Sequence, residues 1–161
     1  LEELDFVWLE EPFFEQKMHH YQALCAELSI PVMATERLMH DMDLCAQWLI
    51  QGATDRIRAN ARHGTTQVLK MAHFAELYGT NIELNGTGGL AGQIHAHLGC
   101  AIVNNDYFEL SVGRNLQALG EAMGVTNAPR LAEGKLIPAD GPGWGVEWDF
   151  DYLEKHTVAV V

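Results

Sequence analysis

The sequence has few basic residues and no long apolar run, and each absence excludes a class of partner. It has 161 residues, with 10 Lys and Arg against 22 Asp and Glu, and its formal net charge is −12 at pH 7. We therefore expect no binding to DNA, RNA or an anionic membrane surface, because all three are polyanions. No apolar stretch reaches membrane-spanning length, and the opening LEELDFVWLEEP has neither a basic segment nor the apolar core of a signal peptide. A cytoplasmic location is the simplest interpretation.

Cysteine is also scarce, which argues against a fold held by disulfides. Cys25, Cys45 and Cys100 are odd in number, widely spaced and set among apolar residues. This pattern predicts reduced, buried thiols. A chain of this length can bury a substantial core, so we expect one domain or part of a larger one. The chain also lacks an initiator Met, and we expect it to begin inside a larger domain.

Short apolar strands alternate with amphipathic helices along the first two thirds of the chain. The strands are expected at residues 5–12, 30–36, 54–60, 81–85 and 106–110. The helices are expected at 16–28, from 41 to near 52, at 65–79 and at 91–102, with Asp41 as a cap and Gly79 as a stop. This alternation predicts βα units, and hence a parallel sheet with helices outside it. Beyond residue 110 the alternation stops, and 141–149, GPGWGVEWD, is predicted to be an ordered loop.

Every predicted strand ends on a polar or ionisable residue. These residues are Glu10 with Glu11, Glu36, Asn60, Asn85 and Glu109. In a doubly wound sheet each could simply cap the next helix or face solvent. In a (β/α) barrel the carboxyl ends of the strands form one ring, so the same residues would converge, and a divalent cation could bind between the carboxylates. Because five strand ends in succession share this property, the sequence favours the barrel.

Four motifs, in this order and spacing, resemble the mandelate racemase and muconate lactonizing branch of the enolase superfamily. They are WLEEP, the Glu of PVMATERL, KMAHFAELYG followed by NIELN, and PADGPGWGVEWD. The resemblance covers nearly the whole chain. It implies that 1–161 is a partial enolase-like C-terminal domain with an α/β fold, part of a TIM-type barrel. Residues 1–110 would hold about the fourth to eighth βα units, and 111–161 would return toward a capping domain that, like the first strands, lies outside this chain.

The resemblance implies a Mg²⁺ enzyme that removes the proton α to a carboxylate through an enediolate. Glu10 and Glu36 resemble the second and third metal ligands, and the first, an Asp, would lie outside the chain. A small-molecule carboxylate would be the substrate, and we expect a homo-oligomer of the full-length protein. Dehydration of a sugar acid is the reaction that we favour. A racemase, epimerase or lactonizing enzyme, and a noncatalytic ligand-binding relative, remain alternatives.

The sequence departs from the family where many members carry an Asp–His pair that acts as general base. Those positions fall on Asn60 and Asn85, although a second register puts Arg58 at the first of them. Asparagine cannot take a proton at neutral pH, so we expect a base from outside the chain, a lysine, with Asn85 orienting the substrate. Glu109 matches an eighth-strand acid of the family. His63, in the loop after the third strand, is a candidate substitute acid or base.

Overall fold

The computed structural model describes residues 1–14, 17–38, 41–110, 113 and 115–159, and of His63 it describes only the backbone. These residues form two compact units. The first comprises Leu1–Asn85 and Ile102–Tyr107, and the second comprises Gly86–Ala101 and Phe108–Val161. Among the described residues, none of the helices combines the length and the apolar character needed to cross a membrane.

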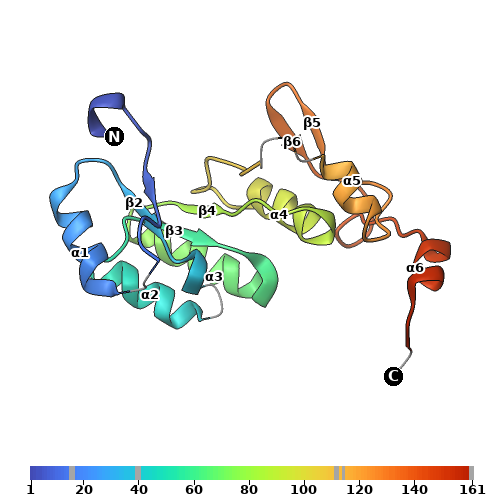
Figure 1. The fold of residues 1–161 in the computed structure, drawn as a ribbon, viewed down its shortest axis with the longest axis horizontal. Helices are drawn as coiled ribbons and strands as arrows, with labels where there is room; N and C mark the ends of the chain where they lie inside the picture. The colour runs from blue at the N-terminus through green and yellow to red at the C-terminus, as the bar shows by residue number, and fades with distance from the viewer. Residues whose placement is uncertain (15–16, 39–40, 111–112, 114, 160–161) are drawn as a thin grey trace. The chain divides into compact units, whose positions relative to one another are not determined.

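The first unit is built on a four-stranded parallel sheet. Its strands are β1 (Leu9–Glu10), β2 (Val32–Ala34), β3 (Arg56–Ala59) and β4 (Ile82–Leu84), in the spatial order β1-β2-β3-β4. The intervening helices are α1 (Met18–Glu27), α2 (Met42–Ile50) and α3 (Thr65–Leu77), and Figure 1 shows them gathered beside the sheet. Single-turn helices lie at η1 (Glu2–Leu4), η2 (Glu36–Leu38) and η3 (Ala61–His63). The predicted βα alternation is confirmed, and the α/β architecture agrees with the part of a barrel that the sequence predicts.

The two faces of the sheet differ in chemistry. Side chains alternate between faces along a strand, and partners in register share a face. One face carries only apolar residues, the half-buried Leu9 and the buried Val32, Ala34, Ile57, Ala59, Ile82 and Leu84. The other face carries Glu10, Met33, Arg56, Arg58 and Glu83. Since the helices pack on the sheet by its apolar face, the second face is where a polar site can be built.

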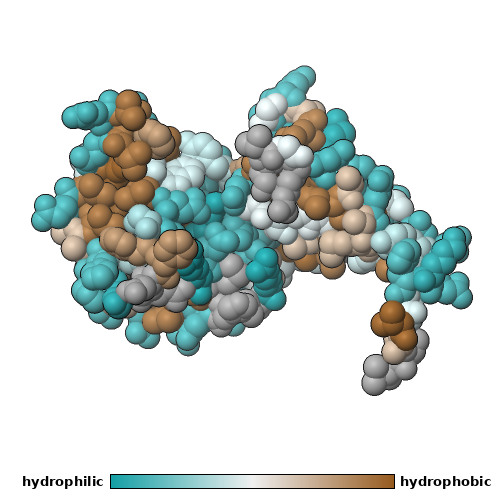
Figure 2. All heavy atoms as spheres, viewed as in Figure 1, coloured by the Kyte–Doolittle hydropathy of each residue, from teal (hydrophilic) through white to brown (hydrophobic). Residues whose placement is uncertain are grey.

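Helix boundaries follow the signals in the sequence. The Asp41 carboxylate accepts a hydrogen bond from Leu44 N at 2.9 Å, so it caps α2 as predicted. Gly79, just beyond α3, has φ of 73°, the left-handed conformation of a helix stop. The predicted strands, in contrast, are longer than the observed ones, most of all at β1. Leu1, Leu4, Phe6 and Val7 remain exposed, and this N-terminal apolar patch is visible in Figure 2.

The strand predicted at 106–110 does not form: of these residues only Phe108 takes part in a single β-bridge, and none belongs to a strand of the sheet. Asn104 O still accepts a ladder-like bond from Ile82 N at 3.0 Å. The next amides instead donate to the buried Glu83 carboxylate, Asp106 N at 3.2 Å and Tyr107 N at 3.1 Å. A side chain thus takes the donors that a continuing strand would offer to its neighbour.

The second unit is more regular than the sequence indicated. It contains α4 (Gly89–Ala101), α5 (Leu116–Glu121), an antiparallel hairpin of β5 (Arg130–Ala132) and β6 (Lys135–Ile137), and α6 (Phe150–His156). The hairpin turns through Glu133 and Gly134, which both have positive φ. The loop at 141–149 is ordered as predicted, because Asn127 donates to Gly145 O at 2.6 Å and accepts from Glu147 N at 2.8 Å.

The three cysteines are free thiols, as predicted. Their burial is not uniform: Cys45 is buried and Cys25 is half-buried. Cys100 is exposed on α4, so the prediction of a buried thiol is wrong there. Its neighbour Leu98 is buried and Ala101 is exposed, which shows that this last turn of α4 presents only part of its surface to the core.

Candidate metal and active site

The carboxylates of Glu10 and Glu36 converge on one cation, the guanidinium of Arg58. Arg58 Nε lies 2.9 Å from Glu10 Oε1 and 3.8 Å from Glu36 Oε2. The Arg58 side chain is 4% exposed, whereas the two carboxylates are 31% and 35% exposed. The three groups come from the carboxyl ends of β1, β2 and β3. The structure therefore brings together the two predicted metal ligands and the arginine of the second register.

The adjacent Glu11 has a different role from Glu10. Glu11 pairs with Arg37, Oε2 to Nε at 3.5 Å, and its Oε1 accepts a hydrogen bond from Arg37 N at 3.2 Å. Its φ of 34° turns the chain directly after the strand. Two neighbouring carboxylates thus diverge, because one joins the polar face of the sheet and the other holds the loop that follows β2.

Backbone strain also precedes Glu36. Thr35 is buried and has φ of 88°, which is rare for a β-branched residue. Its hydroxyl donates to Arg58 O at 2.9 Å and accepts from Arg58 N at 3.2 Å. These two bonds fix the end of β2 to β3 and hold the strained turn that leads into Glu36.

Asn60 and Asn85 form a chain of hydrogen bonds that ends on Glu36. Asn60 Nδ2 donates to Asn85 Oδ1 at 2.5 Å, and Asn85 Nδ2 donates to Glu36 Oε1 at 2.9 Å. Both asparagines are buried, and Asn60 Oδ1 also accepts from Arg62 N at 2.9 Å. The structure brings these predicted site residues together. Neither amide can accept a proton at neutral pH, so the pair orients Glu36 but cannot act as a base.

A second layer of charge lies one step earlier on the same face of the sheet. Arg56 Nη1 lies 3.3 Å from Glu83 Oε1, and Glu83 is fully buried. Trp8 connects the layers, since its ring lies under the Arg56 guanidinium and its Nε1 donates to Glu10 Oε2 at 3.2 Å. The sequence analysis did not predict the structural role of Glu83. The signal was its position two residues before Asn85, which places both side chains on the polar face of the sheet.

The two remaining candidates are placed less fully. Glu109 belongs to the second unit, where its carboxylate accepts a hydrogen bond from Gly86 N, the residue that follows Asn85 in the chain. The backbone of His63 lies in η3, directly after Asn60 and its neighbours, and its side chain is outside the described part. Their predicted roles as site residues stay predictions.

The donor chemistry of the pair fits a hard divalent cation such as Mg²⁺. Two carboxylates already converge on a shared positive charge, and carboxylate oxygens are the ligands that Mg²⁺ prefers. No group of three His, Cys, Asp or Glu side chains suited to a metal occurs within the described ranges. Glu10 and Glu36 would therefore supply two ligands of a site that needs more.

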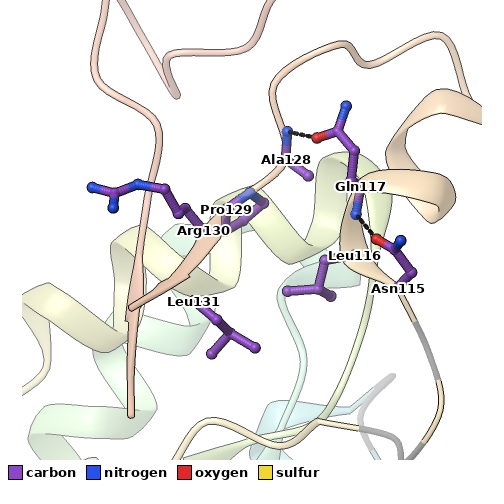
Figure 3. Close-up of a pocket in the computed structure, with 7 residues that line it drawn as sticks. All are labelled: Asn115, Leu116, Gln117, Ala128, Pro129, Arg130 and Leu131. Atoms are coloured by element: carbon purple, nitrogen blue, oxygen red, sulfur yellow. Dashed lines mark hydrogen bonds between the residues drawn. The ribbon is translucent and has the colours of Figure 1, made fainter. Parts of the chain in front are cut away.

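One pocket in the second unit has a different character (Figure 3). It has a volume of about 560 Å³ and is lined by residues 115–117 and 128–131. The Gln117 side-chain oxygen accepts a hydrogen bond from Ala128 N at 3.2 Å, and the Gln117 backbone N–H donates to Asn115 Oδ1 at 2.9 Å. The lining holds no carboxylate, histidine or thiol, so it offers neither a metal ligand nor a base. The strand ends of the first unit remain the candidate site.

Comparison with known families identifies the fold to which the parallel sheet belongs. A family model described as "Enolase C-terminal domain-like" matches residues 1–152. The chain belongs to this family. The resemblance to the mandelate racemase and muconate lactonizing branch, inferred from four motifs, is thereby confirmed.

Individual relatives support the same assignment. The chain is 28% identical over 153 residues to a D-galactonate dehydratase from Verminephrobacter eiseniae, covering 91% of this chain and 40% of the relative. D-glucarate dehydratase from Agrobacterium tumefaciens, solved as a magnesium complex, superposes with a TM-score of 0.82 at 26% identity over 96% of this chain and 40% of that one. A protein from Pseudovibrio sp. assigned to the mandelate racemase/muconate lactonizing enzymes has a TM-score of 0.85 at 23% identity, covering 98% and 42%. The chain thus spans about two fifths of the length of these relatives.

Proposed function

We propose that the full-length protein that carries this chain is a Mg²⁺-dependent enzyme that dehydrates a sugar acid. The observation that carries the proposal is the convergence of Glu10 and Glu36 at adjacent strand ends on a single positive charge. Two of the relatives are named D-galactonate dehydratase and D-glucarate dehydratase, which supports a sugar acid as the substrate class. The rest of the barrel and its capping domain would come from chain outside these residues.

The proposed reaction divides the work between the ion and the chain's own residues. A bound Mg²⁺ would supply Lewis-acid stabilisation of charge at the substrate carboxylate. Glu10 and Glu36 would bind the ion, and the Asn60–Asn85 pair would hold Glu36 in orientation through the 2.9 Å bond from Asn85. A base would take the α-proton to give an enediolate, and a proton delivered to the β-hydroxyl would let it leave as water. The resulting enol would gain a proton at C3 and lose its hydroxyl proton to become a 2-keto-3-deoxy acid.

The base for this step is proposed to lie outside the chain. Arg58 stays protonated, and neither Asn60 nor Asn85 can take a proton, so the described residues around the carboxylate pair offer none. A lysine from the preceding part of the barrel is the first candidate, and His63 is the second. Exchange of the substrate α-proton in D₂O should survive Asn85→Ala at a reduced rate and vanish when that lysine is replaced. Exchange that is lost in His63→Asn alone would assign the base to His63.

Turnover of a substrate panel tests the function directly. Purified full-length protein should convert at least one sugar acid, from a panel that includes D-galactonate and D-glucarate, to a 2-keto-3-deoxy acid detected with semicarbazide. Activity should disappear with EDTA and return with Mg²⁺. Deuterium incorporation at the α-carbon with inversion and no loss of water would instead indicate a racemase or epimerase. Ligand binding with neither exchange nor turnover would support a noncatalytic relative, which the two asparagines at the base positions favour as the second candidate.

A further inference from the structure

Arg58 engages the same carboxylate oxygens that a metal ion would need. Its Nε lies 2.9 Å from Glu10 Oε1, and its Nη2 lies 3.5 Å from Glu10 Oε2. On Glu36 it faces Oε2 at 3.8 Å, while Oε1 is already held by Asn85. The oxygen of Glu36 that is turned away from Asn85 is therefore the one turned toward Arg58.

The neighbouring Arg56 shows that this placement is specific. Arg56 lies two residues earlier on the same strand and face, and it pairs with Glu83. Glu83 also accepts hydrogen bonds from Asn81, Asn105 and two backbone amides, so it is a fully satisfied structural carboxylate. The two predicted metal ligands, by comparison, both pair with the guanidinium of Arg58.

We propose that Arg58 is a positioning residue that holds Glu10 and Glu36 together before a divalent cation binds and that sets their affinity for the cation. The inference rests on the proposed function, because it concerns the same two carboxylates. An arriving ion has to separate Arg58 from both of them. The Leu84 carbonyl accepts a hydrogen bond from Arg58 Nη1 at 3.5 Å. It would remain a neutral acceptor for the guanidinium after the ion has displaced Arg58 from the carboxylates.

The direction of the effect follows from charge. Arg58 stabilises the metal-free pair of carboxylates and repels a divalent cation bound between them, and both effects weaken metal binding. Even with the screening of bulk water, a unit charge about 5 Å from a divalent ion weakens its binding by roughly tenfold. Neutralising Arg58 should therefore tighten Mg²⁺ binding, although it removes a contact that orders the site.

Calorimetric titration of the full-length protein with Mg²⁺, without substrate, tests this sign. Arg58→Gln should bind Mg²⁺ at least about tenfold more tightly than wild type, and Arg58→Lys, which keeps the charge, should stay within about threefold. The control is Arg56→Gln combined with Glu83→Gln, which removes an ion pair from the same face without changing the net charge and also should stay within about threefold. Equal affinity in Arg58→Gln and wild type, or an equal rise in the control, would overturn the proposal.

A second measurement follows the wild-type protein and uses a substitution only to assign one resonance. In wild-type protein labelled with ¹⁵N-arginine, the Nε–H resonance of Arg58, assigned by its loss in Arg58→Lys, should shift as Mg²⁺ is added. The shift should have the midpoint of the calorimetric titration, and the Arg56 resonance should stay unchanged. If wild-type protein binds Mg²⁺ and the Arg58 resonance does not shift, the role proposed for Arg58 is wrong, but the proposed function is not affected. Absence of Mg²⁺ binding in wild type, at millimolar metal, instead contradicts the proposed function.

Discussion

Replacing Asn85 by Ala should lower the free energy of unfolding by about 2 to 4 kcal/mol, because Asn85 is a buried link in a chain of hydrogen bonds. It donates to the Glu36 carboxylate at 2.9 Å and accepts from Asn60 at 2.5 Å. A hydrogen bond to a charged group contributes about 1.5 to 3 kcal/mol, and a buried donor left without its acceptor costs about 1 to 3 kcal/mol. Asn60 is fully buried, so its amide has no access to water as a replacement.

A double-mutant cycle isolates the link between the two asparagines. Urea unfolding of Asn60→Ala, Asn85→Ala and the double variant of the full-length protein should give a coupling energy of about 1 kcal/mol or more. The double variant should thus be less destabilised than the sum of the single variants, because the broken bond is counted once. Effects that add to within about 0.3 kcal/mol would show that the amides do not depend on each other, and the account of Glu36 orientation would be wrong.

Other parts of the structure lead to three further predictions. Thr35→Val keeps the branched shape but loses both bonds to the Arg58 backbone, so it should destabilise the protein by about 1 to 3 kcal/mol, whereas Thr35→Ser should cost less; equal losses in urea would contradict this. Burial, the largest cause, raises the pKa of Cys45 to about 11, and Cys100 is exposed. Since the thiolate is the reactive form, iodoacetamide at about pH 8 should label Cys100 first, and the rate at Cys45 should rise as the pH approaches its pKa; mass spectrometry that found Cys45 labelled first would refute the assignment. Residues 1–161 expressed alone should self-associate and be inactive, because the N-terminal apolar patch is exposed and β1 pairs only with β2 among the described strands; light scattering from a monomer with cooperative unfolding and Mg²⁺-dependent turnover would contradict this.

The fold was predictable where local patterns carry the information. Alternating apolar runs and helical stripes predicted the order of β1 to β4 and α1 to α4, and Asp41 and Gly79 marked helix ends correctly. The failure at 106–110 came from Glu83, whose side chain captured two backbone amides from a distant part of the chain. A tertiary interaction of that kind leaves no periodic signal in the segment that it changes.

The candidate site was predictable in its membership but not in its arrangement. Strand-end position alone grouped Glu10, Glu36, Asn60 and Asn85, and the structure joins them through ion pairs to Arg58 and hydrogen bonds at one end of the sheet. The sequence left two registers open for β3. The structure accommodates both, because Arg58 and Asn60 lie on the same face two residues apart, as strand alternation requires. The positive φ of Thr35 had no sequence signal, since a β-branched residue is an unfavourable choice there.

The most direct test of the central claim compares three glutamates in the full-length protein. Glu10→Gln and Glu36→Gln keep size and shape but remove a carboxylate charge, and Glu11→Gln makes the same change at the adjacent residue that pairs with Arg37. Calorimetry should show Mg²⁺ affinity reduced by about tenfold or more in the first two variants and nearly unchanged in the third, because of these three glutamates only Glu10 and Glu36 would contact the ion. Unchanged affinity in both Glu10→Gln and Glu36→Gln, with wild-type binding intact, would contradict the assignment of this site.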